Sequence, residues 1–239
     1  MKTTRTPYFI TAVLCICLAG CARTSTDSTT ITRGSAPVAG HDQKAGKCTP
    51  AEAITLLIEG NDRFASGQPL HPRQDPERRA ELSTSQQPFA VIIGCSDSRT
   101  SPEVLFDQGL GDLFVIRVAG NVVDDHALGS VEYAVEHLHT QLVMVLGHAR
   151  CGAISAARET VAAKGHAEGH VDSLVASIRP AVEATLGQDA DATCKANIRN
   201  VVRALQTSEP ILRHMAEAGE IKVVGAYYDL DTGRVEWLQ

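Results

Sequence analysis

The sequence is poor in aromatic residues and has no cluster of basic residues. Phe, Trp and Tyr make up 4% of its 239 residues, with a single Trp, so a hydrophobic core must be built mainly from Ala, Val, Leu and Ile. The formal net charge is −6, and an acidic balance without a Lys/Arg patch argues against nucleic-acid binding. The length allows one full-sized core or two small ones.

The seven cysteines are too few and too scattered for a disulfide scaffold. No Cys-x-x-Cys pair occurs, which argues against a local redox dithiol. Three cysteines lie within the first 21 residues, and Cys95 and Cys151 lie just after apolar runs. Cys48 and Cys194 are left over, and a disulfide between them and two free thiols are equally open interpretations.

The first 20 residues are typical of a secretory signal. Lys2 and Arg5 precede a short apolar run, roughly residues 8–18, which is too short for an ordinary membrane-spanning helix. The run ends in Leu18-Ala19-Gly20-Cys21, which resembles the lipobox of bacterial lipoproteins. That resemblance implies cleavage before Cys21 and lipid attachment to it. A plain signal peptide and an uncleaved anchor are the alternatives.

The next segment separates this signal from the folded part. Residues 22–47 are rich in Thr, Ser, Gly and Ala and have no apolar period, as expected of a flexible tether. The chain therefore divides into a signal (1–20), a lipidated cysteine with its tether (21–48) and one folded domain (49–239). Such a protein would face the periplasm from a lipid anchor in the bacterial cell envelope, and Ala22 after the cysteine fits the outer membrane.

Strand and helix patterns alternate along the folded domain. Thr49, Pro50 and Glu52 form a capping box that starts a helix ending near Gly67. Further helices are expected over 76–83, 129–138, 152–163 and 192–218. Continuous apolar runs, typical of strands buried on both faces, occupy 89–94, 113–118 and 142–147, and a hairpin joins 221–230 to 234–238. This alternation predicts an α/β fold with a mostly parallel central β-sheet flanked by helices.

Two polar motifs lie where predicted strands end. Cys95-Ser96-Asp97-Ser98-Arg99 follows the first strand, and His148-Ala149-Arg150-Cys151 follows the third. Open α/β sheets bind ligands at the carboxyl ends of their strands. A buried cysteine or a local Asp–Arg pair explains either motif alone, but two thiols and one imidazole together match a catalytic zinc site with one open position. We therefore predict that Cys95, His148 and Cys151 bind zinc.

The pattern C-x-D-x-R followed by H-x-x-C resembles that of the β-class carbonic anhydrases. The similarity continues through 113–117, 119–121 and 129–134 and covers roughly residues 49–238. It implies the β-carbonic anhydrase fold, a zinc cofactor, and reversible hydration of carbon dioxide to bicarbonate and a proton by attack of zinc-bound hydroxide. It also implies a homodimer as the minimal unit, or a tetramer.

The resemblance assigns roles to further residues. Asp97 pairs with Arg99 and orients the hydroxide, and in a closed form Asp97 itself binds the metal. For the substrate, it implies that the Gln86 amide donates a hydrogen bond and that Gly152 lies near the hydroxide. It also implies an apolar wall made of Phe114, Ala119 and Tyr133. In the dimer, the amide and the two aromatic residues would reach the neighbour's zinc.

Departures from the family pattern indicate which type of active site the chain has, and other functions stay open. Ile92 stands where the bicarbonate-regulated members have Trp, and Thr100 and Val118 also differ, which favours a type I, plant-like active site. A carbon disulfide or carbonyl sulfide hydrolase on the same fold is one alternative, and a non-catalytic, zinc-stabilised envelope module is another. The helix over 50–64 either wraps a partner or packs on its own core, and 164–170, with His166 and His170, is read as a loop more than as a weak metal site.

Overall fold

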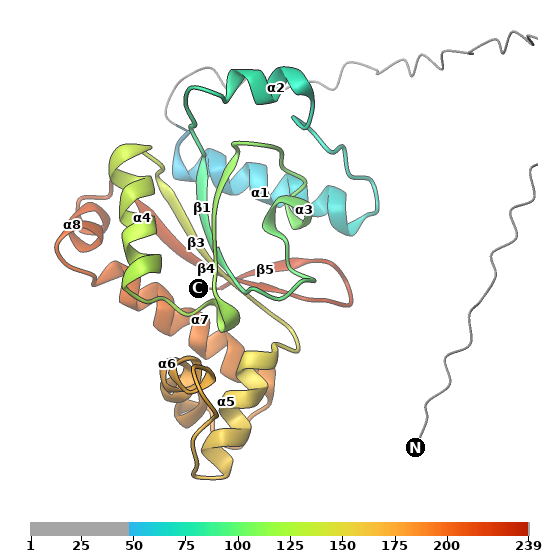
Figure 1. Cartoon of the computed structure of the whole chain (residues 1–239). Helices are drawn as coiled ribbons and strands as arrows, with labels where there is room; N and C mark the ends of the chain where they lie inside the picture. The colour runs from blue at the N-terminus through green and yellow to red at the C-terminus, as the bar shows by residue number, and fades with distance from the viewer. Residues whose placement is uncertain (1–47, 239) are drawn as a thin grey trace, which may run out of the picture. The chain divides into compact units, whose positions relative to one another are not determined.

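The computed structural model describes residues 48–238, and its centre is a five-stranded sheet (Figure 1). The strand order is β2-β1-β3-β4-β5. The strands are β1 (Ala90–Gly94), β2 (Leu113–Arg117), β3 (Leu142–His148), β4 (Lys222–Tyr228) and β5 (Val235–Leu238). All neighbours are parallel except β4 and β5, which form an antiparallel hairpin. The predicted fold class, a mostly parallel sheet flanked by helices, is confirmed.

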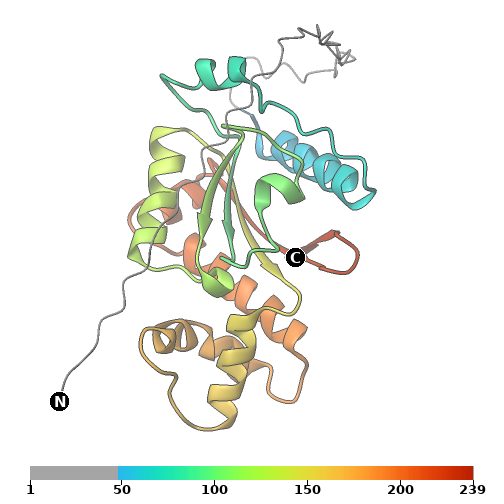
Figure 2. The same cartoon turned by 45° about the vertical axis from the view of Figure 1, so that its right-hand side comes forward.

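Helices cover both faces of this sheet. They are α1 (Pro50–Ala65), α2 (Pro76–Glu81), α3 (Pro102–Leu105), α4 (Asp125–His137), α5 (Gly152–Ala162), α6 (Val171–Ala184), α7 (Ala190–Gln206) and α8 (Ile211–Glu217), with a 3-10 turn, η1 (Ala119–Asn121). Buried residues of α4 to α8 pack with Val91, Ile93 and Val143 on one face, and those of α1 and α3 pack with Ala90 and Ile92 on the other. In both views α5 and α6 lie side by side at one end of the domain (Figures 1 and 2).

The capping box at the start of α1 is present as predicted. The Thr49 hydroxyl accepts from the Glu52 amide, and the Glu52 carboxylate accepts from the Thr49 amide. Ala53 and Leu57 are fully buried in the core cluster that α1 shares with the sheet. A Cβ at Gly60 would lie 1.7 Å from the Phe106 carbonyl oxygen, so glycine is what permits this close approach. The helix therefore packs on the core of its own chain.

Several local predictions were wrong. β2 is not buried on both faces, because it lies at the edge of the sheet and its residues stay half-exposed. The helix expected over 192–218 is two helices, α7 and α8, separated at Thr207–Pro210, where proline cannot continue a helix. Helix α6 was missed. His148 is the last residue of β3 and does not follow it.

The N-terminal predictions concern residues that the structure does not describe. The signal over 1–20, the lipidated Cys21 and the tether over 22–47 lie outside the described residues. Within residues 48–238, no helix has both the length and the apolar character needed to cross a membrane.

Candidate metal centre

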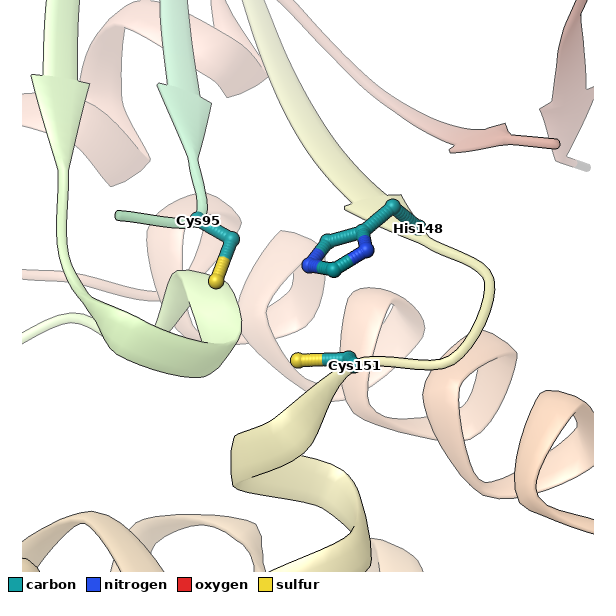
Figure 3. A group of neighbouring side chains, drawn as sticks. All are labelled: Cys95, His148 and Cys151. Carbon is teal, nitrogen blue, oxygen red and sulfur yellow. The ribbon is translucent and has the colours of Figure 1, made fainter. Parts of the chain in front are cut away.

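The three predicted zinc ligands meet at the ends of two neighbouring strands. Cys95 follows β1, His148 ends β3, and Cys151 caps the N-terminus of α5 (Figure 3). β1 and β3 are parallel partners, with Gly94 opposite Leu146, so both motifs emerge at one edge of the sheet. The two thiol sulfurs and an imidazole nitrogen all lie within 4.8 Å of one another, and all three residues are buried.

The imidazole of His148 is oriented by its own turn. Its Nδ1 lies 2.9 Å from the Ala149 carbonyl oxygen, which can only accept a hydrogen bond, so Nδ1 carries the proton. The other nitrogen, Nε2, is buried and has no hydrogen-bond partner among the described residues. A buried acceptor without a partner is costly, and a metal ion would satisfy it.

The Cys95 and Cys151 thiols shift each other's pKa in opposite directions. A hydrogen bond from Cys151 lowers the pKa of Cys95, and the Gly120 amide, which donates to Cys95 Sγ at 3.2 Å, lowers it further. The same hydrogen bond and burial raise the pKa of Cys151. Zinc binding requires both thiols to ionise, and the lowered pKa of Cys95 favours this for one of them. Two soft sulfur ligands and one free imidazole nitrogen fit zinc.

Asp97 lies beside these ligands but is held by Arg99. The guanidinium donates to both carboxylate oxygens, at 2.9 and 2.7 Å, and Asp97 Oδ2 is 3.9 Å from His148 Nε2. The hydrogen bond from Arg99 holds the pKa of Asp97 far below its usual range, although burial opposes it. Arg117 donates to the carbonyl oxygens of Cys95 and Asp97, at 2.9 and 2.6 Å, which fixes this loop.

Two predicted substrate contacts lie together in a hollow of about 750 Å³. Gln86 and Tyr133 line it, together with Arg79 and His137, and no metal ligand does. The Phe114 and Tyr133 rings have centroids 6.3 Å apart. Within one chain, the structure thus groups these aromatic and amide side chains apart from the metal ligands.

The other two predicted contacts lie near the ligands themselves. Ala119 begins η1, the turn whose Gly120 amide donates to Cys95. Gly152 follows Cys151 and is exposed, and a Cβ built there would meet nothing within 4 Å. These two residues therefore border the metal centre, whereas Gln86 and Tyr133 do not.

Sequence reasoning missed several residues of the site. Arg117 donates to the loop that carries Cys95, and the Arg150 carbonyl, within the second motif itself, accepts from Arg99, but neither arginine was given a role from the sequence. His137 contacts Tyr133, with ring centroids 5.2 Å apart, and the spacing of four residues on a predicted helix could have suggested it. Asn121 is 1% exposed and neither polar atom of its side chain has a partner among the described residues.

The remaining cysteines and the histidine-rich loop stand apart from the three ligands. Cys48 and Cys194 are free thiols that belong to core clusters on opposite faces of the sheet, so they are not paired here. His166 lies 3.4 Å from Asp172 and is exposed. His166 and His170 join no group of three potential metal ligands among residues 48–238.

Comparison with known proteins extends the agreement over most of the described chain. The family model described as carbonic anhydrase matches residues 90–235. A carbonic anhydrase of Mycolicibacterium smegmatis is 43% identical over 192 residues, which cover 78% of this chain and 92% of the relative.

Solved structures give the same result. A Coccomyxa β-carbonic anhydrase in complex with acetazolamide has a TM-score of 0.60 and 28% identity, and the match covers 77% of this chain and 86% of that one. Two tetrameric β-carbonic anhydrases of Sordaria macrospora share the fold, with a TM-score of 0.62 and 23% identity over 77% of this chain and 96% of that one.

Proposed function

The chain belongs to the β-class carbonic anhydrases, and we propose that it works as an assembly of at least two copies held at a membrane by a lipid. It is a zinc enzyme that interconverts carbon dioxide and bicarbonate. The observation that carries this conclusion is the buried set of Cys95, His148 and Cys151 at adjoining strand ends.

The residues around the ligands divide the chemistry among them. Zinc in such a site supplies a nucleophile at neutral pH by lowering the pKa of a water molecule. Asp97 is ionised and can only accept a hydrogen bond, so it would accept one from the O–H of the nucleophile and leave an oxygen lone pair of that nucleophile facing carbon dioxide. Arg99 donates hydrogen bonds to both oxygens of Asp97 and would thereby keep the carboxylate from binding the metal in place of water.

The assembly is proposed because the substrate-contacting residues are separated from the ligands within one chain. Gln86 and Tyr133 line an open hollow whose walls include none of the three metal-binding residues, and Tyr133 is 47% exposed. A second copy that covers the hollow would bring its own metal centre to them. The tetrameric Sordaria macrospora enzymes show that this fold assembles in a relative.

The lipid anchor is proposed from the N-terminal sequence. The run Leu18-Ala19-Gly20-Cys21 follows a short apolar segment, and the 26 or so residues after Cys21 would let the domain stand away from the membrane. An enzyme anchored on the periplasmic face of the envelope would equilibrate carbon dioxide and bicarbonate there. Mass spectrometry of the protein from cell envelopes tests this: a diacylated or triacylated Cys21 is expected, and an intact Met1 or an unmodified Cys21 would exclude it.

The activity itself is tested by stopped-flow hydration of carbon dioxide by the full chain, with zinc measured on the same sample. We expect hydration that scales with zinc, at about one ion per chain. Carbon disulfide and carbonyl sulfide should be poor substrates in parallel assays. A zinc-loaded protein without hydration activity would indicate a structural zinc site.

A further inference from the structure

The turn that carries two of the metal ligands is held from outside by the β4–β5 hairpin. The amide of Ala149 donates to the Tyr228 carbonyl at 2.9 Å, which extends the β3–β4 pairing past His148. Arg150 then takes a left-handed backbone conformation, with φ of 52°. For a residue other than glycine this conformation is uncommon and needs support from its surroundings.

That support comes from Asp231 at the tip of the hairpin. Both terminal nitrogens of Arg150 donate to the Asp231 carboxylate, at 2.8 and 2.9 Å. The tip is itself ordered, because the Asp229 carboxylate accepts from the amides of Asp231 and Thr232, at 2.9 and 2.8 Å. Asp231 is thus presented by a fixed turn, and its contact with Arg150 is bidentate, the geometry in which Arg–carboxylate pairs are most directional.

The Arg150 backbone leads directly to the Asp97–Arg99 pair. One terminal nitrogen of Arg99, Nη2, lies 3.3 Å from the Arg150 carbonyl oxygen and 2.7 Å from Asp97 Oδ2. The position of the Arg150 carbonyl therefore helps to set the position of Arg99. A continuous chain of contacts runs from the hairpin tip, through Arg150 and Arg99, to Asp97.

We propose that Asp231 is a positioning residue that clamps Arg150 and thereby holds both the His148–Cys151 turn and Arg99 in place. The proposal rests on the zinc enzyme described above, but it concerns how firmly the ligands are held and not which reaction follows. Both side chains of the clamp are more than half exposed, at 55% and 72%. The expected effects are accordingly smaller than the 10–100-fold typical of residues that hydrogen-bond a ligand directly.

Release of zinc from the intact, loaded chain to a chromophoric chelator measures the clamp without reference to catalysis. We expect Asp231→Asn and Arg150→Ala each to speed zinc release about three- to tenfold, and the double variant to be no faster than the faster single one. Arg150→Gly should release zinc more slowly than Arg150→Ala, because glycine accepts the left-handed backbone without a clamp. The visible spectrum of the cobalt-substituted protein should change in Asp231→Asn, since the ligand geometry loosens.

Arg213 provides a matched control. It is also about half exposed and pairs with Glu209 and Glu217 at 2.8 Å, but on α8, away from the ligand turn. Arg213→Gln should leave zinc release and the cobalt spectrum unchanged. If Asp231→Asn behaves like Arg213→Gln, or if the two clamp variants have additive effects, the proposal is wrong. A chain that binds zinc normally but does not hydrate carbon dioxide would instead contradict the proposed function and leave the clamp measurable.

Discussion

The metal centre and the hollow differ in how completely one chain builds them. Cys95, His148 and Cys151 are each at most 4% exposed, and their donor atoms converge without help from outside. Gln86 and Tyr133 line an open hollow at the surface, and none of the three metal-binding residues lines it. One chain therefore builds the whole metal centre, whereas in the proposed assembly a second copy covers the hollow.

The two regions are also fixed by different means. The ligands emerge from β1 and β3, whose backbones are locked by sheet pairing on both sides. The hollow depends on the long connection between α1 and β1, which includes α2 and Gln86. Two buried carboxylates hold this connection: Asp107 accepts from Arg63 and from the amides of Leu70 and His71, and Asp112 contacts Arg73 and Arg78.

Removal of a ligand should break the metal centre alone and have the largest effect. Cys151→Ser replaces a thiolate by a hydroxyl, a poor zinc ligand, so we expect zinc affinity to fall by at least about a hundredfold and hydration to approach background. Elemental analysis and stopped-flow assays on one preparation measure both. Cys194→Ser is the control, because that buried thiol donates to the His148 carbonyl and is no ligand. Full zinc retention by Cys151→Ser would refute the site.

Variants of the Asp97–Arg99 pair should separate metal binding from chemistry. Arg99→Ala and Asp97→Asn leave all three ligands in place, so zinc should remain while activity falls about tenfold to a thousandfold. In the wild type, activity should rise with pH through the neutral-to-alkaline range, where zinc-bound water titrates.

The pKa of Asp97 decides how the pH profile of Arg99→Ala should look. Arg99 lowers the pKa of Asp97. Without the guanidinium, the pKa of Asp97 should rise only to the value of a free aspartate, about 4. Asp97 therefore stays ionised at neutral pH in both proteins, and the variant should be impaired at every pH, because the carboxylate is free to take the metal's open position. Wild-type activity of Arg99→Ala across the range would exclude this gate.

Mixed assemblies test whether the hollow serves a neighbour. If Gln86 donates to the developing bicarbonate, as the family resemblance implies, Gln86→Ala should lower kcat/KM about tenfold to a hundredfold with normal zinc. If Gln86 acts on the partner's metal, a mixed dimer of Gln86→Ala and Cys151→Ser chains contains one intact site. Mixing two nearly inactive proteins should then restore up to about half of the wild-type activity per such dimer.

The control for complementation is a mixture in which both chains carry both substitutions, which should stay inactive. Sedimentation measurements on the same mixtures establish that the chains exchange. Exchange without recovery of activity would show that Gln86 serves its own chain, and the proposed assembly would lose its main support.

The metal centre was predictable from sequence because its signals are local. Each motif stands at the end of a continuous apolar run, and parallel strands end at the same edge of a sheet. That β1 and β3 are direct neighbours, which brings the two motifs within reach of one metal ion, is a property of the folded sheet. The hollow was not predictable, since its walls come from three separate segments: α2 with the loop after it, the turn at Leu110 and Gly111, and α4. The exposure of a strand was hidden in the same way. An apolar run such as 113–118 reads the same in the centre of a sheet and at its half-exposed edge.

Contacts between distant segments were equally hidden. Arg150 and Asp231 are 81 positions apart, and nothing in either sequence neighbourhood indicates the other. The break between α7 and α8 is different, because Pro210 is a visible helix breaker that the apolar periodicity over 192–218 outweighed in the prediction. Local sequence thus indicates most helices and strands, whereas side-chain contacts between distant loops form only in the folded chain and have no local signal.

The smallest expected effect on the metal centre comes from a change in Asp107, which supports the hollow; this change should affect the stability of the fold, with a defined pH dependence. Burial alone would raise the pKa of Asp107, but hydrogen bonds from Arg63 and from the Leu70 and His71 amides lower it below its usual range. A carboxyl whose pKa is lower in the folded than in the unfolded chain stabilises the fold above the unfolded pKa of about 4. That stabilisation disappears as the pH falls through the folded pKa.

Asp107→Asn should therefore lower the free energy of unfolding by about 3 kcal/mol at pH 7, because Arg63 loses its buried partner, and by less as the pH approaches 3. Urea unfolding at both pH values measures the difference. Asp62→Asn is the matched control, since Asp62 pairs with Arg234 at 2.9 Å but is exposed, and it should change stability by less than about 1 kcal/mol. Zinc content should be normal in both variants, because neither contacts β1 or β3 ends. A loss of zinc in Asp107→Asn would show that the metal centre and the hollow are not independent.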